Sequence, residues 1–142
     1  MHFVTKKFLG YPFAHRVHNH DGLCKKLHGH SWDFEVSFTA DSLDEKGFVI
    51  DLGKLQEVRS FFEQYFDHTV VLAEDDPLLD NFRELQNLGA LKLLVLPHCS
   101  SEAIAEFVAN EVGEIIKDKK ASVSSVLVRE SFKNSATYVP DL

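Results

Sequence analysis

The chain has 142 residues, of which 44% are hydrophobic and 26% charged, so it can form one globular domain with a core but not two ordinary ones. Its net charge of −7 argues against a general nucleic-acid-binding protein, which needs a dense basic surface. No apolar run approaches the roughly 18 residues that cross a bilayer, and the N-terminus lacks a signal-peptide core. We expect one cytoplasmic domain over 1–142, without a membrane partner, in which Cys24 and Cys99 are reduced thiols.

The first third of the chain predicts two strands joined by a turn. A strand that begins near residue 3 is expected to end near His15, with a bulge or an edge at Gly10. Residues 18–22 have the composition of a turn. Apolar and polar residues then alternate strictly over 31–40, which predicts a half-buried strand.

Five of the eight histidines fall within sixteen residues around this turn, and they are His15, His18, His20, His28 and His30. If the strand extends back to His28 and His30, their side chains share one face, because side chains alternate along a strand. Three imidazoles without an obvious fourth protein ligand are typical of catalytic zinc, which keeps one coordination position open. We therefore expect His15, His28 and His30 to bind zinc. The alternatives are histidines without a metal, or a closed site in which Cys24 is the fourth ligand.

The middle of the chain predicts two helices and a short strand. Asp51 is expected to cap a helix that runs to about Phe66, because apolar residues recur there at helical spacing. His68 follows this helix beside Asp67, a position that favours proton transfer. The other elements expected here are a hairpin through the turn at 44–47 into the apolar run at 48–50, a short helix between Pro77 and Gly89, and a strand at 92–96.

The last third of the chain predicts a long amphipathic helix and two strands. Ser100 or Ser101 can cap the helix, which fades near residues 117–120. Strands are expected over 122–132 and 136–139. Glu130 falls on the apolar face of the first of these strands, where a carboxylate is costly to bury unless it is paired or bound to a ligand. The alternative is a Glu130 that is exposed or salt-bridged at the end of the strand.

The order of these features resembles the 6-pyruvoyl-tetrahydropterin synthase and 6-carboxytetrahydropterin synthase family. The matching residues are Ala14-His15-Arg16, Cys24-x-x-x-His28-Gly29-His30, Asp67-His68, Ser101-Glu102 and Glu130, so the resemblance spans nearly the whole chain. It implies an α+β tunnelling fold, with a four-stranded antiparallel sheet and two main helices on one face. It also implies that subunits join into a β-barrel, as a homo-oligomer that is a trimer or a hexamer.

The resemblance further implies roles for several of the matching residues. His15, His28 and His30 would hold one Zn²⁺ per subunit, and Cys24 would be the catalytic thiol with Asp67 and His68 as its proton relay. Glu130 would anchor the pterin ring. Substrate binding is also assigned to Ser100, Ser101 and Lys25, with Lys25 meeting the triphosphate, for which Arg16, Lys26 and Lys133 are further candidates.

The three residues between Cys24 and His28 resemble the 6-carboxytetrahydropterin synthase branch, whose spacer is shorter than that of the 6-pyruvoyl enzymes. The expected reaction converts 7,8-dihydroneopterin triphosphate to 6-carboxy-5,6,7,8-tetrahydropterin, acetaldehyde and triphosphate, in the queuosine or another 7-deazaguanine route. The alternatives are a 6-pyruvoyl-tetrahydropterin synthase, another pterin side-chain lyase, or a non-catalytic metal- or pterin-binding protein. The connection at about 73–97 is longer than in compact family members, and His98-Cys99-Ser100 replaces their Asn-Pro-Thr, which leaves the ring specificity open.

Overall fold

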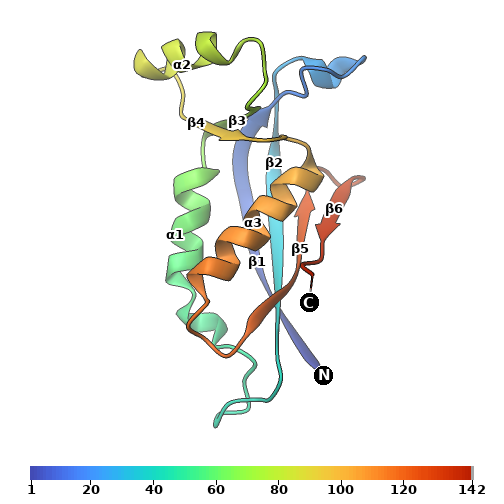
Figure 1. Ribbon diagram of the computed structural model, residues 1–142, viewed down its shortest axis with the longest axis vertical. Coiled ribbons are helices and arrows are strands. Elements are labelled where there is room, and N and C mark those ends of the chain that lie inside the picture. The colour runs from blue at the N-terminus through green and yellow to red at the C-terminus, as the bar shows by residue number, and fades with distance from the viewer. Residues whose placement is uncertain (142) are drawn as a thin grey trace.

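The computed structural model describes residues 1–141, which form a curved sheet of six strands with three helices (Figure 1). The strand order across the sheet is β4-β3-β1-β2-β5-β6. The elements are β1 (His2–His15), β2 (His28–Ala40), α1 (Gln56–Tyr65), β3 (Thr69–Ala73), α2 (Leu79–Asn87), β4 (Leu93–Leu96), α3 (Ser101–Ile115), β5 (Ser122–Arg129) and β6 (Ser135–Tyr138).

The β1–β2 hairpin is the centre of the sheet, and its register positions the histidines. The two strands are antiparallel from the pair His2 and Ala40 to the pair His15 and His28. Their register shifts between Phe8 and Tyr11, around Gly10, whose φ of 77° is left-handed, so the expected bulge is confirmed. The alternation predicted over 31–40 is also confirmed, because the apolar side chains of Trp32, Phe34, Val36 and Phe38 are all completely buried.

The sheet is larger than the four-stranded antiparallel sheet that was expected. Strands β1, β2, β5 and β6 are antiparallel, but β3 pairs with β1 in parallel and β4 pairs with β3 in parallel. The short apolar run of β3 does not alternate, as is typical of buried parallel strands, and this hid it from the sequence analysis. The hairpin expected at 48–50 is wrong, because Val49 and Ile50 enter the core from a loop and form no strand.

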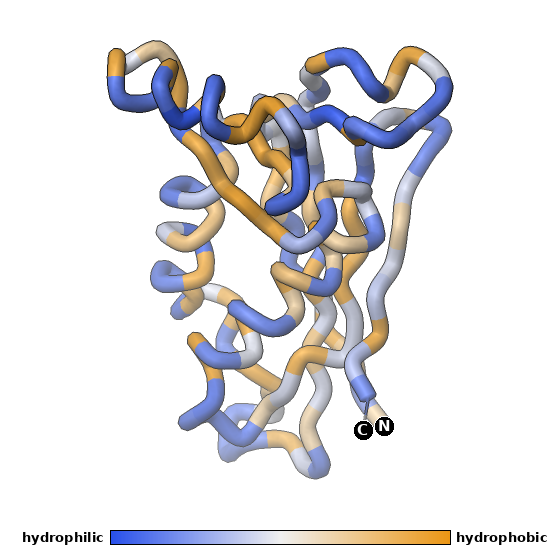
Figure 2. The backbone as a smooth tube through the Cα atoms, turned by 45° about the horizontal axis from the view of Figure 1, so that its top comes forward, coloured by the Kyte–Doolittle hydropathy of each residue, from blue (hydrophilic) through white to orange (hydrophobic). Residues whose placement is uncertain are grey.

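Helices α1 and α3 lie side by side on one face of the sheet, as expected for the two main helices (Figure 1). Phe62 of α1 packs on Phe8 of β1, with ring centroids 4.6 Å apart, and Phe61 meets Phe107 of α3 at 5.9 Å. Helix α2 was also expected, but it lies beyond the end of the sheet, at the same end as the loop that joins β1 to β2. Hydrophobic residues concentrate in the strands and the inner sides of the helices, and the loops are mainly hydrophilic (Figure 2).

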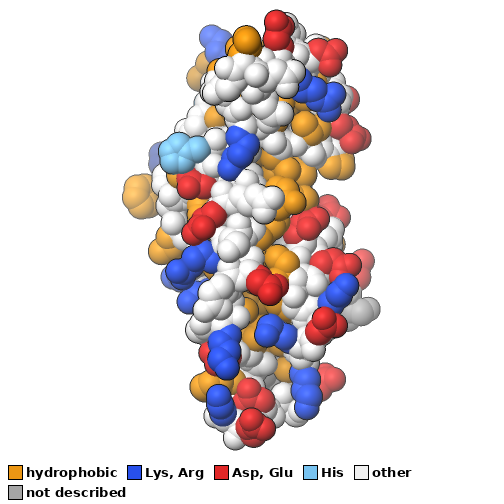
Figure 3. Space-filling model, turned by 90° about the vertical axis from the view of Figure 1, so that its left-hand side faces the viewer, with side chains coloured by type: hydrophobic (Ala, Val, Ile, Leu, Met, Phe, Trp, Pro, Cys, Tyr) orange, Lys and Arg blue, Asp and Glu red, His pale blue; other side chains and the backbone are white. Residues whose placement is uncertain are grey.

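The surface on the side of α1 carries acidic and basic side chains intermixed, with hydrophobic atoms exposed between them (Figure 3). No single sign of charge dominates that view. Within residues 1–141, none of the helices has the length and apolar character needed to span a bilayer.

Candidate active site

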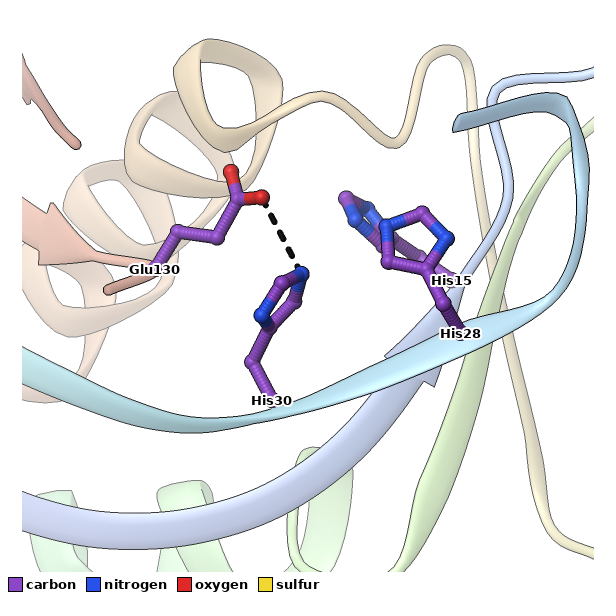
Figure 4. A group of neighbouring side chains, drawn as sticks. All are labelled: His15, His28, His30 and Glu130. Carbon is purple, nitrogen blue, oxygen red and sulfur yellow. Dashed lines mark ion pairs between the residues drawn. The ribbon is translucent and has the colours of Figure 1, made fainter. Parts of the chain in front are cut away.

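Four side chains converge at one end of the sheet, with ligand atoms that all lie within 4.8 Å of one another (Figure 4). They are His15 at the end of β1, His28 and His30 at the start of β2, and Glu130 just after β5. The strands explain the convergence, because His15 faces His28 across the hairpin and His30 lies two residues further along the same face. The clustering predicted for the three histidines is therefore observed.

Main-chain carbonyls fix the tautomers of two of these rings. The Nδ1 of His15 lies 2.8 Å from the carbonyl oxygen of Cys99, and the Nδ1 of His28 lies 2.7 Å from that of Lys26. A carbonyl can only accept, so each Nδ1 carries a proton, and in the neutral form of the ring Nε2 has the free lone pair. Burial lowers the pKa of His15, which favours its neutral form at neutral pH. Both rings are thus prepared as metal ligands.

His30 and Glu130 meet at the same point. The Nε2 of His30 is 3.0 Å from Oε1 of Glu130, but the contact lacks hydrogen-bond geometry, and this buried nitrogen has no hydrogen-bond partner within residues 1–141. A buried nitrogen in that state is costly unless another group binds it. The donor set of three imidazoles and one carboxylate fits a zinc ion. Glu130 is also a possible fourth protein ligand, which the sequence analysis did not recognise.

A cavity of about 590 Å³ opens beside this cluster and has the size of a small-molecule site. Its lining includes five of the residues expected to act in the site, which are His15, Cys24, Ser100, Ser101 and Glu130. The hydroxyl of Ser101 donates to Oε2 of Glu130 at 3.0 Å, and Ser100 caps α3 by accepting from the Ala103 N–H. Another cavity, of about 800 Å³, lies at the opposite end of the sheet. Among the described residues, its lining includes no histidine or cysteine.

Cys24 is partly exposed in a short 3₁₀ turn, Leu23–Lys25, within the loop between β1 and β2. Its sulfur is not among the ligand atoms of the cluster, although the residue lines the same cavity. Among the described residues, the geometry therefore favours an unligated thiol at the cavity over a fourth zinc ligand.

Asp67 and His68 form a pair outside this cavity. The Nδ1 of His68 lies 2.7 Å from Oδ1 of Asp67, and His68 has a left-handed φ of 57°. The side chain of His68 is 82% exposed, and neither residue lines the cavity within one chain. Their role as a proton relay stays a prediction.

The basic residues that were candidates for the triphosphate also differ in whether they line the cavity. Lys25 and Lys133 are both exposed, but only Lys133 lines the cavity. Arg16 is held by Asp76 in an ion pair, which occupies the guanidinium that was a candidate for the triphosphate. His20 is exposed but also lines the cavity. The sequence signal for His20 was its place in the histidine cluster.

Residues 4–141 match the family described as 6-pyruvoyl tetrahydropterin synthase. A 6-carboxy-5,6,7,8-tetrahydropterin synthase of Rickettsia felis is 30% identical over 101 residues, which cover 70% of this chain and 72% of that protein. A probable 6-carboxy-5,6,7,8-tetrahydropterin synthase of Halobacterium salinarum is 32% identical over 111 residues, with coverages of 78% and 70%. The structure of Caenorhabditis elegans 6-pyruvoyl tetrahydropterin synthase is 21% identical and covers 99% of this chain and 98% of that chain with a TM-score of 0.69, which shows a common fold.

Proposed function

The chain belongs to the 6-pyruvoyl tetrahydropterin synthase family, and on this basis we propose that it is a zinc-dependent lyase. It converts 7,8-dihydroneopterin triphosphate and water to 6-carboxy-5,6,7,8-tetrahydropterin, acetaldehyde and triphosphate, in a cytoplasmic route to queuosine or another 7-deazaguanine. The observation that carries the proposal is the cluster of His15, His28 and His30 beside a cavity that His15 and Cys24 both line. The short Cys24–His28 spacer and the names of the two relatives support the 6-carboxy branch.

Each side chain around the cavity has its own role in the proposed reaction. A zinc ion on the three imidazoles would polarise the side-chain hydroxyls of the substrate and ease the loss of neighbouring protons. Cys24, as a thiolate, accepts a proton from carbon and returns it. Glu130 accepts two adjacent N–H groups of the pterin ring in a fork, and its bond from Ser101 orients the carboxylate. Lys133 binds the triphosphate in preference to Lys25, because Lys133 lines the cavity and Lys25 does not.

The proton relay of Asp67 and His68 completes the reaction in an oligomer. The two side chains are already paired, but neither lines the cavity of its own chain. A neighbouring subunit therefore supplies them to the cavity in a homo-oligomer, a trimer or a hexamer, whose sheets join into a barrel. The exposed position of His68 supports this arrangement.

The test of the function is product analysis with the purified, zinc-loaded protein and 7,8-dihydroneopterin triphosphate. Mass spectrometry should detect the 6-carboxy product, together with acetaldehyde. A 6-pyruvoyl or 6-hydroxymethyl product would assign the chain to another branch of pterin side-chain lyases. The Cys24→Ala variant should keep its zinc and lose turnover, whereas His98→Ala, which changes an exposed histidine outside the cavity, should retain both.

A non-catalytic metal- or pterin-binding protein is the alternative of a different class. It predicts that zinc and the pterin bind without turnover. Loss of zinc in Cys24→Ala would indicate a closed structural site in which the thiol is a ligand. The separation of Cys24 from the ligand cluster favours the lyase over this alternative.

A further inference from the structure

A buried ion pair lies next to the active site and is not used by the proposed reaction. Arg16 binds Asp76 through two parallel contacts, Nε to Oδ2 at 2.7 Å and Nη2 to Oδ1 at 2.8 Å. The side chain of Asp76 is completely buried and that of Arg16 is 11% exposed. Such forked pairs fix the orientation of both partners, and removal of one partner leaves an uncompensated buried charge. The pair is therefore a rigid connection.

The pair connects the long segment between β3 and β4 to the metal-binding end of β1. Asp76 precedes α2, and its Oδ1 also accepts from the Leu78 N–H at 2.8 Å. Arg16 directly follows His15, and its own carbonyl accepts from the Cys99 thiol at 2.9 Å. Cys99 in turn holds His15 through its carbonyl. Arg16 thus stands between α2 and the histidine cluster.

The same arginine reaches the loop that carries Cys24. Nη1 of Arg16 donates to the carbonyl of Lys25 at 3.3 Å, and the neighbouring Val17 N–H donates to the carbonyl of Cys24 at 2.8 Å. None of the residues 18–26 is buried, so the core does not hold this loop. The loop and α2 lie at the same end of the sheet (Figure 1).

We propose that the Arg16–Asp76 pair positions the thiol of Cys24 in the cavity. The carboxylate of Asp76 orients the guanidinium of Arg16, and the guanidinium holds the main chain beside Cys24. Arg16 and Asp76 are positioning residues that do not touch substrate. The expected effect of the Arg16–Asp76 pair on turnover rests on the proposed function, but its expected effect on the position of the Cys24 thiol does not.

The test compares Asp76→Asn with Asp75→Asn in the zinc-loaded full chain. Asn at position 76 can still accept from the Leu78 N–H, but its amide group opposes the N–H donors of Arg16 and opens the fork. Asp75 is the matched control, because its carboxylate is 68% exposed and contacts the same loop only through His18. Exposed ion pairs of this kind contribute little to the stability of the folded chain.

The main readout is the rate at which iodoacetamide alkylates Cys24, followed by peptide mass spectrometry that separates Cys24 from the buried Cys99. In Asp76→Asn this rate should rise about fivefold or more, because the loop opens more often. The kcat should fall about tenfold and KM should change by less than about twofold, because Ser101 and Glu130 still bind the ring. Zinc content should equal that of the unaltered chain.

Two results would overturn the proposal. One is an alkylation rate in Asp76→Asn within twofold of that in Asp75→Asn. The other is loss of zinc together with the change in alkylation, which would assign the pair to the metal cluster instead. If Asp76→Asn does not fold, Arg16→Met/Asp76→Asn removes both charges and is judged by the same rates. A chain without pterin turnover whose alkylation rate still rises in Asp76→Asn would reject the proposed function and keep the positioning role.

Discussion

The three histidines of the cluster differ in what holds them. His15 and His28 are fixed by the carbonyls of Cys99 and Lys26, whereas the Nε2 of His30 faces Glu130 without a hydrogen bond. Glu130 therefore has two possible partners, a metal ion and the N–H groups of a pterin. The bond from Ser101 to its Oε2 already orients the carboxylate for a fork.

Replacement of Glu130 by Gln separates these two roles. The amide keeps the size of the side chain but cannot accept two N–H donors, so KM should rise about tenfold or more while zinc content is unchanged. The measurements are steady-state kinetics and zinc stoichiometry. Glu102→Gln is the control, because Glu102 is an exposed carboxylate on the same cavity. If zinc affinity in Glu130→Gln falls as far as in His30→Ala, Glu130 is a ligand and not the ring anchor.

The buried His15 predicts how acid affects the metal-free protein. Burial lowers the pKa of His15 from its ordinary 6.5, and the bond to Cys99 only partly opposes this. The unfolded chain then binds more protons than the folded chain just below pH 6.5, so the free energy of unfolding falls as pH decreases through that range and is level above it. Urea denaturation between about pH 7 and about pH 5 measures this fall.

The control for this prediction is His15→Gln, which has no imidazole at that position. Its unfolding free energy should decrease less over the same pH range. Asp76, whose pKa is lowered chiefly by its hydrogen bond from Arg16, loses its contribution below its ordinary 3.8 and does not act in this window. An equal decrease in both proteins would show that His15 is not the group responsible.

At single positions, the sequence indicated which side chains lie in the site more reliably than it indicated the groups that contact them. Glu130 was expected on the apolar face of a strand over 122–132, but β5 ends at Arg129 and Glu130 follows it, where it reaches the histidines. The carbonyl of Cys99 that fixes His15 could not be foreseen, because every residue carries a carbonyl. Arg16 and Asp76 are 60 positions apart, and no local pattern links them. Arg16 was therefore interpreted only as a candidate for the triphosphate, without its partner Asp76.

Among the elements, every strand except β3 was predicted, including the short apolar strand β4. Strand β2 alternates because it covers the core with one face only, and its position was confirmed. Strand β3 is apolar on nearly every residue, and its parallel pairing with β1 depends on a crossover through α1 that periodicity does not encode. Without β3, the predicted sheet had no parallel pairs, whereas the observed sheet is mixed.

The bulge in β1 gives a prediction at this scale. Gly10 has a φ of 77°, which an alanine adopts only with strain, so Gly10→Ala should lower the free energy of unfolding by about 1–2 kcal/mol. Gly113 lies inside α3 with open space around its missing side chain, so Gly113→Ala should raise it by about 0.5–1 kcal/mol. Urea denaturation compares the two variants. A change of the same sign in both would contradict the role of the bulge.

For the whole molecule, the resemblance predicted the antiparallel part of the sheet and the side on which the main helices pack. It did not predict the parallel pairing of β3 and β4, the two strands that flank the long segment around α2. Both edge strands of the sheet, β4 and β6, have one unpaired side within the described chain. Edges of this kind can pair with another chain, which is the physical basis of the predicted barrel. The assembly itself stays a prediction.

Mixing two inactive variants tests whether the active site is shared between chains. Cys24→Ala lacks the thiol and His68→Ala lacks the relay, so each should be inactive alone. If one subunit supplies Cys24 and a neighbour supplies His68, random reassembly restores both groups in about a quarter of the sites, because each is intact with a probability of about one half. Activity should therefore return to about 25% of that of the unaltered chain.

The exposed position of His68, away from the cavity of its own chain, is the reason to expect this recovery. If both groups instead acted within one chain, no subunit in the mixture would carry the two together, and the mixture would stay inactive. The measurement is turnover of 7,8-dihydroneopterin triphosphate after joint dissociation and reassembly. Native mass spectrometry verifies that mixed oligomers have formed, so that inactivity in their presence would place the relay outside a shared site.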